Sequence, residues 1–359
     1  MILIPIVELG EDGPVELARR MPEAARAALS AALSAHPALP ILARLGDRLT
    51  RRWLERGDDP YAPEIAEIAG LVDLPGAWLL NCVYEWACAT SAGPDPAGRG
   101  ARLVRLLDWG MPGLGRRIVV ARRSTRYGPF DDITWPGYVG TLTASAPGRF
   151  AAAINQAPRQ APIGIRSLDE IAVRIGMLRR PGTIPLSHFL RHIFETAPDW
   201  DTALALLTAP EPEISAPGFV ILAGTRPQEY AVIELLGRRR RLHQGDGMVG
   251  VANDWLAPGF PGVPRPPARA GGEKLPAPAN NRLRRGQIMD CQAAPFTGAE
   301  RLPAPVLNAN TVLAVEAVPA SGALLVEGLE RKLPADVRPR VVARVRTRPS
   351  PVRLANSMA

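Results

Sequence analysis

Apolar and polar positions divide the chain into a mainly helical first quarter and a strand-rich remainder. Residues 2–8 form a short run rich in β-branched side chains, which is typical of a strand. The segments that follow are rich in Ala, Leu, Glu and Arg or carry apolar residues at helical spacing, and they predict helices. These helices are expected at residues 14–35, 40–56, 63–72 and 77–86.

After residue 88 the pattern changes to short runs of apolar and small residues, which predict strands. Strands are expected at 89–92, 102–109, 118–122, 134–143, 149–155, 219–223, 230–235 and 248–252, with a late hairpin at 312–318 and 323–328. Helices are expected at 167–178, 185–196, 200–208 and 280–291, and Asp199 is a candidate N-cap. Because strands occur in runs and the helices are segregated from them, this order indicates an α+β layered architecture.

Two segments lack a periodic pattern. Residues 257–279 are dense in Pro, Gly and Ala and are expected to form a loop, either a plain surface excursion or a lid over a site. The residues after 334 are rich in Arg, Pro and Val and are expected to form a basic tail without stable structure.

Composition narrows the partners of the chain. It has 43 Lys and Arg residues against 35 Asp and Glu, a net charge of +8, and nearly all of the basic residues are Arg. Such a surface favours nucleic acid, anionic lipid or acidic substrates, although a general abundance of Arg explains the same number. No basic stripe interleaved with aromatic residues is visible, so no nucleic acid is expected. The arginine run at 238–241 is either a solvated hairpin turn or a contact with an anionic membrane.

Three cysteines, Cys82, Cys88 and Cys291, do not make a disulfide framework, and free thiols indicate a reducing compartment. The N-terminus lacks the basic region and cleavage site of a signal peptide, so a cytoplasmic location is expected. An apolar stretch at 69–89 is interrupted by three polar residues and a proline. A buried core segment is therefore favoured over a membrane span.

Cys88 is the candidate nucleophile. It is followed by small and hydroxyl residues, and Arg105-x-x-Asp108 comes on the next predicted strand. Hydrolysis by a cysteine needs a thiolate, a base and donors for the oxyanion, yet none of the four histidines lies near Cys88 in sequence. The α-amino group of an N-terminal cysteine can act as the base, because its pKa is about 7.7–8.0. This base requires the chain to cut itself between Ala87 and Cys88. A buried inert cysteine is the alternative.

The segments around Cys88 form an ordered set of motifs. They are Asn81-x-x-Tyr84-Glu85, then Cys88-Ala89-Thr90-Ser91, then Arg105-x-x-Asp108-Trp109-Gly110, followed by the segments 136–143, 147–155, 216–224, 251–254 and 280–282. This set resembles, in order, the motifs of the acid ceramidase family and its relative N-acylethanolamine acid amidase. The resemblance extends from about residue 61 to residue 328.

The resemblance implies an N-terminal-nucleophile amide hydrolase with a four-layer αββα sandwich. Self-cleavage before Cys88 would give a helical α-chain, residues 1–87, and a β-chain, residues 88–334. The two chains would remain associated as one domain, with residues 335–359 as a basic tail.

The resemblance also implies a role for each matching residue. Cys88 would be the nucleophile and its freed amine the base. Arg105 and Asp108 would organise the thiol and the amine, with Asp108 hydrogen-bonded to the amine. Asn253 would donate to the oxyanion of the tetrahedral intermediate, and Arg282 would hold neighbouring polar groups in place.

Some positions depart from the family pattern. Val104 and Leu106 stand where the family has Gly and Asn, and Gln156 stands where it has Glu. A glutamine keeps the hydrogen bonds of a glutamate but neither its charge nor its ability to accept a proton. Two residues are also missing between Glu85 and Cys88. These departures point to altered specificity, or to slow or absent self-processing.

A fatty-acyl amide substrate needs an apolar groove. Aromatic candidates for its walls, each of which could equally belong to the core, are Trp86, Trp109, Trp135, Trp255 and Phe260. His188 and His192 lie four residues apart on a predicted helix, but no third ligand is apparent, so two incidental histidines are favoured over a metal site. No metal or other cofactor is expected.

The sequence therefore predicts a cysteine amidohydrolase that cleaves the amide bond of a ceramide-like or N-acylethanolamine-like lipid, through an acyl-enzyme on Cys88. One alternative is an acyl-amide hydrolase of the bile-salt hydrolase or penicillin acylase type. The other is a non-processing homologue that binds lipid, to which Gln156 points.

Overall fold

The fold, obtained as a computed structural model, is described for residues 1–33, 39–82, 87–160, 176–177, 179–263, 275–333, 336 and 338–347. Predictions that fall outside these residues are most of the helix at 167–178, residues 264–274 of the loop at 257–279, and the candidates Tyr84, Glu85 and Trp86.

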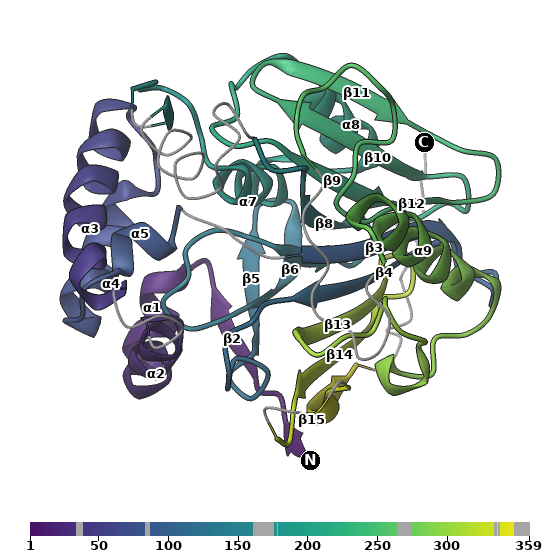
Figure 1. Cartoon of the computed structure of the whole chain (residues 1–359), viewed down its shortest axis with the longest axis horizontal. Helices are drawn as coiled ribbons and strands as arrows, with labels where there is room; N and C mark the ends of the chain where they lie inside the picture. Colours follow the sequence, from purple (N-terminus) through teal and green to yellow (C-terminus); the bar gives the residue numbers. More distant parts are fainter. Residues whose placement is uncertain are drawn as a thin grey trace, which may run out of the picture.

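Two β-sheets form the centre of the described structure (Figure 1). The first, sheet A, has in spatial order β1 (Ile2–Leu3), β15 (Arg340–Arg346), β14 (Ala323–Glu330), β13 (Thr311–Val318), β4 (Ala101–Asp108), β3 (Ala87–Pro94) and β12 (Val249–Val251). The second, sheet B, has β11 (Arg239–His243), β10 (Tyr230–Leu236), β9 (Gly218–Ala223), β8 (Phe150–Gln156), β7 (Thr143–Ala146), β6 (Gly128–Thr134), β5 (Val119–Thr125) and β2 (Ile6–Gly10).

Buried side chains show how the sheets are layered. One cluster joins the inner faces of both sheets and includes Leu107 of β4 and Phe219 of β9. A second cluster lies between sheet B and the helices α7 (Leu186–Thr196) and α8 (Trp200–Thr208). A third lies between sheet A and helix α9 (Ala277–Asp290). The order helix, sheet, sheet, helix confirms the predicted α+β class and four-layer αββα arrangement.

The strands that carry the candidate nucleophile are buried on both faces. In β3, Cys88 belongs to the cluster between the sheets, whereas its neighbour Ala89 belongs to the cluster under α9. In β4, Leu107 and Leu106 divide in the same way. Successive side chains of a strand point to opposite faces, and here both faces are covered. These strands therefore consist largely of small and apolar residues without a polar face.

Within the described part of the segment before Cys88, five helices pack together to one side of the sheets (Figure 1). They are α1 (Pro14–Arg20), α2 (Pro22–Leu33), α3 (Leu39–Arg56), α4 (Ala62–Val72) and α5 (Ala77–Leu80). Their shared core includes Trp53 and Ile65, and Val139 of the β6–β7 connection packs into it. The first ten residues belong to the sheets themselves, because β1 pairs with β15 and β2 pairs with β5. The segment before Cys88 thus contributes a strand to each sheet.

Helix ends differ from the prediction where proline or glycine intervenes. The helix predicted at 14–35 is divided at Met21, because Pro22 begins α2 and proline disfavours a helical residue before it. The helix predicted at 77–86 ends at Leu80 within the described residues. The N-cap prediction for α8 is confirmed, since Asp199 Oδ1 accepts a hydrogen bond from the Thr202 amide at 2.8 Å.

Three predictions on strands, turns and the tail needed correction. Residues 134–143 are not one strand, because they form the connection between the last residue of β6 and the first residue of β7, and Gly137 in it has φ +89°. The arginine run at 238–241 is a turn only at Arg238, which forms the hairpin turn with Gly237 (φ +60°); β11 begins at Arg239 and contains the other three arginines. The segment predicted as an unstructured tail contains β15, which pairs with β14 and β1.

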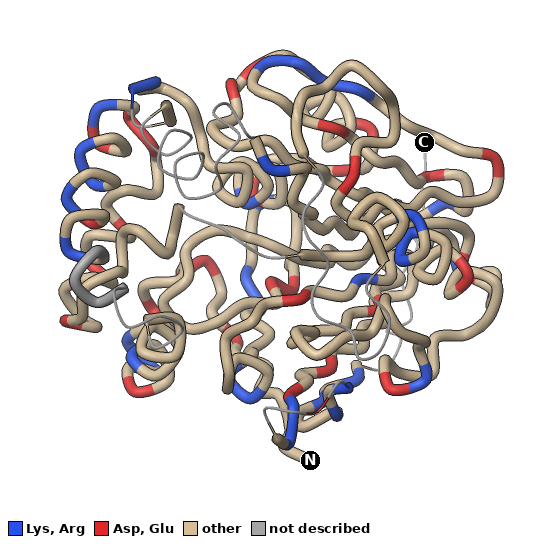
Figure 2. Tube along the Cα trace, viewed as in Figure 1, with Lys and Arg blue, Asp and Glu red and all other residues tan. Residues whose placement is uncertain are grey.

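Charged residues are spread over the molecule, and blue Lys and Arg segments alternate with red Asp and Glu segments (Figure 2). The arginines of the 238–241 run have internal partners: Arg240 donates to Pro212 O at 2.6 Å, and Arg241 donates to Pro258 O at 2.6 Å. This distribution favours a general abundance of arginine over a dedicated anion-binding surface. In the described part of the chain, no helix combines the length and the apolar character needed to span a bilayer.

Candidate active site

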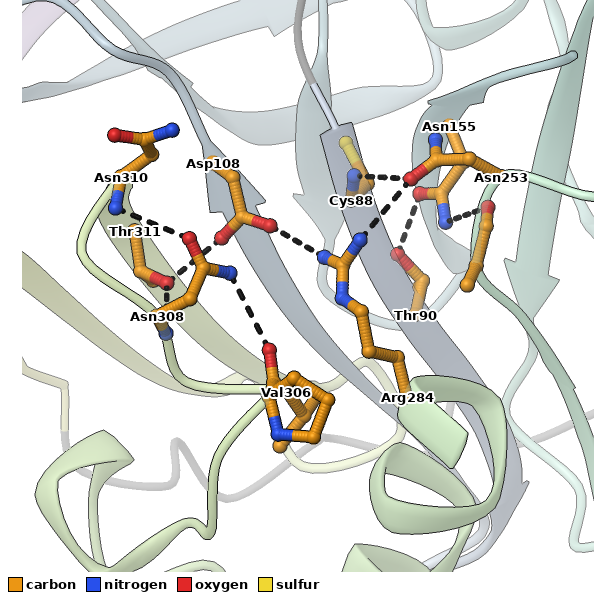
Figure 3. A network of polar contacts seen from close by, with 12 residues as sticks. Cys88, Thr90, Asp108, Asn155, Asn253, Arg284, Val306, Asn308, Asn310 and Thr311 are labelled. Carbon is orange, nitrogen blue, oxygen red and sulfur yellow. Dashed lines mark hydrogen bonds and ion pairs between the residues drawn. The ribbon is translucent and has the colours of Figure 1, made fainter. Parts of the chain in front are cut away.

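Cys88 lies at the start of β3 with its side chain between the two sheets (Figure 3). It is fully buried and pairs with Leu107 of β4. Its backbone N–H donates to Asn253 Oδ1 at 3.0 Å, and its thiol lies 3.8 Å from the carbonyl oxygen of Ile154. Ala87 and Cys88 are consecutive residues of β3, so this is the geometry of the uncut chain.

Arg105 brings a positive charge to the thiol. It lies on β4, is fully buried, and places Nη2 3.4 Å from Cys88 Sγ. The same guanidinium donates to Leu142 O at 2.7 Å and to Ile154 O at 2.8 Å, and it also contacts the Thr143 hydroxyl. Arg105 therefore links sheet A to β7 and β8 of sheet B and is held beside the sulfur.

The pKa of the Cys88 thiol is raised. Burial is the main cause and Asp108 adds to it, while Arg105 and Arg284 act in the opposite direction. In the uncut chain the thiol is therefore protonated at neutral pH and is a weak nucleophile.

Asp108 ends β4 and is held from the side of α9 and β13. Arg284 of α9 forms an ion pair with Oδ2, and the Thr311 hydroxyl donates to Oδ1 at 2.7 Å. Burial raises the pKa of Asp108, although Arg284, Thr311 and Asn308 lower it. In the uncut chain the Cys88 amide N–H donates to Asn253 Oδ1; that Asp108 binds the amine after cleavage, as the family resemblance implied, stays a prediction.

Asn253 follows β12 and joins several parts of the site. Its Oδ1 accepts from the Cys88 nitrogen and from Arg284 Nη1 at 3.3 Å. Its Nδ2 donates to the backbone carbonyl of Gln156 at 2.8 Å. The Gln156 contact with Asn253 thus uses the main chain, which a glutamate at this position would supply equally.

Four further residues, which the sequence analysis did not name as site residues, complete the site. Thr90 donates to Asn155 Oδ1 at 2.6 Å, and Asn155 Nδ2 donates to Val251 O and Ala252 O at 3.1 and 3.2 Å. These bonds connect β3, β8 and the end of β12, which carries Asn253. Thr311 and Asn308 hold Asp108 from β13 and the turn before it. The hydroxyl residues directly after Cys88 were a sequence signal for Thr90; no comparable signal marked Thr311.

The arginine at this site is Arg284, not Arg282. Arg284 is buried and contacts Asp108 and Asn253, whereas Arg282 is exposed two residues earlier on α9. The buried positions of α9 include 281, 284 and 288, and residue 282 faces away from them. The role assigned to Arg282 therefore belongs by position to Arg284.

An apolar pocket lies between the helical segment and the sheets. Trp109, Met111, Trp135 and Tyr138 line one side, and Leu29 and Ile68 line the other. The indole rings of Trp109 and Trp135 meet edge to face with centroids 5.9 Å apart. Trp109 directly follows Asp108, which pairs with Ala87, so this pocket approaches the bond before Cys88.

Trp255, another candidate for the wall of the acyl groove, lies in a different environment. Trp255 packs against Phe219 and Phe260, with ring centroids 5.1 and 4.9 Å away, and is not among the residues that line this pocket. Of the four aromatic candidates within the described residues, Trp109 and Trp135 line a cavity, whereas Trp255 and Phe260 belong to an aromatic cluster.

The histidines of α7 do not form a metal site. His188 is fully buried, and its Nδ1 lies 2.8 Å from Asp59 Oδ2. Across the described residues, no group of three or more His, Cys, Asp or Glu side chains is arranged to hold a metal ion.

No family model matches the chain, and no curated protein matches it in sequence. Among solved structures it is similar to an N-acylethanolamine-hydrolyzing acid amidase orthologue from Caenorhabditis elegans, with 18% identity over 65% of this chain and 93% of that chain, and a TM-score of 0.48. It is also similar to a mutant conjugated bile acid hydrolase from Clostridium perfringens, with 7% identity over 71% of this chain and 92% of that chain, and a TM-score of 0.34. These values are too low to transfer the activity of either protein to this chain.

Proposed function

We propose that this chain is a cysteine amidohydrolase that cuts its own Ala87–Cys88 bond and then cleaves the amide bond of an N-acyl lipid. The observation that carries the proposal is the setting of Cys88. Its sulfur faces Arg105 at 3.4 Å, and the nitrogen that cleavage would free is already bound by Asn253 at 3.0 Å. A nucleophile and its own amine are thus oriented by two different partners, as catalysis by an N-terminal cysteine requires.

Self-cleavage would begin with attack of the Cys88 sulfur on the carbonyl carbon of Ala87. The thiol proton passes to the departing nitrogen of Cys88, the C–N bond breaks, and a thioester joins the Ala87 acyl group to the sulfur. Water then cleaves the thioester and leaves the Ala87 carboxylate and the free Cys88 thiol and amine. The raised pKa of the Cys88 thiol in the uncut chain makes this first step slow.

Cleavage of substrate would follow the same chemistry with an external amide. The freed amine accepts the thiol proton, the sulfur attacks the acyl carbon, and the leaving amine takes a proton as its C–N bond breaks. Water then hydrolyses the acyl-thioester to the carboxylic acid and restores the thiol. Arg105 stabilises the thiolate, and Asn253 positions the amine.

The apolar pocket supports an acyl-chain substrate. Among its lining residues are Ala28, Leu29, Ile68, Trp109 and Trp135, and no charged side chain is among the described residues that line it. A hydrocarbon chain placed there would lie between the two segments that cleavage separates, with its carbonyl end toward Trp109 and the start of β3.

The setting we propose is the reducing cytoplasm, to which the free cysteines Cys82, Cys88 and Cys291 are suited. An intact thiol at Cys88 is required in the mechanism, so a compartment that keeps thiols reduced also keeps the nucleophile active.

The decisive measurement is the intact mass of the purified chain after incubation from about pH 4.5 to about pH 8. The expected result is two chains of 87 and 272 residues (359 − 87), with Cys88 at the start of the second. The matched control is Cys88→Ala, which should stay uncut. The cut protein is then assayed with acyl amides of graded chain length. An uncut, inactive wild-type chain that nevertheless binds these amides would instead establish the lipid-binding alternative.

A further inference from the structure

Polar side chains of sheet B hold the chain on both sides of Asn253. Before it, Asn155 of β8 donates to the carbonyl oxygens of the two preceding residues, at 3.1 and 3.2 Å. After it, Glu234 of β10 accepts from the backbone N–H of Leu256 at 2.6 Å. Because Asn253 Oδ1 binds the Cys88 nitrogen, the place of this oxygen depends on how the backbone around Asn253 is fixed.

Glu234 does not act alone. It is fully buried, and Arg241 lies directly opposite it on β11, with Nη1 3.9 Å from Glu234 Oε2. The same Nη1 donates to Ala257 O at 3.2 Å and to Pro258 O at 2.6 Å. The carboxylate and the guanidinium of one cross-strand pair thus hold the three consecutive residues 256–258.

Packing also holds this segment, but packing does not fix its orientation. Leu256 lies against the apolar cluster between the sheets, and the guanidinium of Arg241 lies 3.9 Å from the ring centroid of Phe260. Apolar burial is non-directional, whereas a hydrogen bond weakens steeply as its angle departs from the preferred range. Glu234, which is also 3.2 Å from Nε2 of His243 on β11, therefore supplies what packing lacks, a fixed place for the Leu256 N–H.

We propose that Glu234 and Arg241 are positioning residues for Asn253. By fixing residues 256–258 they hold Asn253 where its Oδ1 binds the Cys88 nitrogen, and they act through Asn253 rather than on the substrate. The catalytic use of this nitrogen rests on the proposed function. Its hydrogen bond to Asn253, however, is present in the uncut chain and is measured there.

The test measures amide hydrogen exchange by NMR on the uncut Cys88→Ala chain. Two amides report: residue 88, whose N–H donates to Asn253, and Leu256, whose N–H donates to Glu234. Glu234→Met removes the acceptor, and exchange at both amides is expected to become about tenfold faster. Glu234→Gln keeps an oxygen that accepts a hydrogen bond, so exchange should stay within about threefold of the parent.

Glu327→Met is the matched control. Glu327 is also fully buried, accepts from a backbone N–H, that of Ala299, at 2.7 Å, and pairs with Arg344. It lies on β14, which two strands separate from β3 in sheet A. Its loss should therefore speed exchange at Ala299 and leave residue 88 unchanged.

Self-cleavage of the chain with Cys88 intact gives the functional measurement. Glu234→Met should slow it by about tenfold, and Glu234→Gln should restore it to near the parent rate. Arg241→Met is a milder variant, because 28% of the Arg241 side chain is exposed. It should speed exchange at residue 88 by about threefold, and it carries the test if Glu234→Met does not fold.

Faster exchange at Leu256 with parent-like exchange at residue 88 would overturn the inference, because Glu234 would then anchor its segment without affecting Asn253. Equal acceleration at residue 88 by Glu327→Met would also overturn it, since the effect would then be a general loss of stability. If exchange responds as expected but the wild-type chain never cuts itself, the positioning role stands and the proposed function fails. If the wild-type chain cuts itself and Glu234→Met does so at the same rate, the proposed function stands and the inference fails.

Discussion

Arg191 is the residue whose loss should most weaken the connection between the two segments that flank the cleavage site. It lies on α7, after Cys88, with 3% of its side chain exposed. Its guanidinium donates twice to Glu64 of α4, at 2.7 and 2.8 Å, and stacks on Tyr61 with 4.1 Å to the ring centroid. It also donates to Glu195 at 2.8 Å and to Val139 O at 3.1 Å.

The magnitude follows from what Arg191→Met leaves behind. Glu64 loses both of its charged hydrogen bonds, while Glu195 keeps Arg123 at 2.7 Å and the Tyr61 hydroxyl. Removing one member of a buried ion pair costs about 3–5 kcal/mol. Both carboxylates are about a quarter exposed, at 27% and 23%, and water compensates part of the loss. The free energy of unfolding is therefore expected to fall by about 3 kcal/mol, the lower end of that range.

The assay is equilibrium urea unfolding of the uncut Cys88→Ala chain, in which the two segments remain covalently joined. Arg19→Met is the matched control, because Arg19 also pairs with a glutamate, Glu67, but is 51% exposed. This control should cost less than about 1 kcal/mol. In the cut protein, Arg191→Met should also release the 87-residue chain at a lower urea concentration than the parent. A change in unfolding free energy no larger than that of the control would refute the reasoning.

Three further predictions concern titration and the site. Burial raises the pKa of Asp132 to about 7 from its ordinary value of 3.8, so between these values the folded state binds more protons and stability falls as pH rises. Asp132→Asn should remove this decline from urea midpoints measured between about pH 5 and pH 7.5; an unchanged slope would contradict it. Thr311→Val removes a hydrogen bond to Asp108 and should slow self-cleavage by about tenfold while leaving the fold intact. Mass spectrometry follows the cleavage and circular dichroism follows the fold. Cleavage at the parent rate would show that this bond does not matter. Finally, the buried, protonated thiol of Cys88 in the uncut chain should resist alkylation by iodoacetamide at neutral pH, whereas cleavage should make it reactive. Peptide mapping measures the alkylation. Early alkylation of Cys88 in uncut protein would count against this prediction.

Much of the layered fold could be predicted because its strands are short and its helices amphipathic. α7 and α8 lie within one residue of their predicted bounds, and Asp199 caps α8 as expected. β15 was missed because its arginines alternate irregularly with Val and Ala, and the pairing that orders it comes from β14 and β1, far away in sequence. Local composition does not report such long-range pairing.

The site shows the same division between local and long-range information. The structure brings together Cys88 of β3, Arg105 of β4 and Asn253, which follows β12 of the same sheet; the order of the motifs had placed these three residues in one predicted site. Matching motifs by their position in the sequence selected Arg282 instead of Arg284, because such a match does not consider which side of the helix a residue faces. The pattern Asn280, Arg284, Ile288 at intervals of four would have identified the buried arginine from the sequence.

Local sequence also predicts a strand at 134–143, where residues 135–142 form a connection. Its apolar residues are buried without being paired in a sheet: Val139 packs into the helical core that includes Ile65 of α4, and Trp135, Tyr138 and Leu142 belong to the cluster between the sheets. Gly140 shows why: a Cβ there would lie 2.4 Å from Ser187 Oγ of α7, so only glycine permits this approach. This close packing places Leu142 O against Arg105 and Val139 O against Arg191, and it thereby joins the site to the segment before Cys88.

The contacts of Asn253 bear on the effect of Gln156 in place of the family's glutamate. In the uncut chain Asn253 Oδ1 accepts the single N–H of the Cys88 amide, and Asn253 Nδ2 is occupied by the Gln156 carbonyl. After cleavage the same nitrogen would be an amine, which can donate to Oδ1 and still present a lone pair to the thiol proton. The main-chain contact of residue 156 is the same for glutamine and glutamate. If glutamine in place of glutamate at position 156 affects cleavage, it therefore acts through its side chain on proton transfer. Gln156→Glu should then change the pH dependence of self-cleavage. The same substitution in the uncut Cys88→Ala chain should leave the free energy of unfolding close to that of its parent.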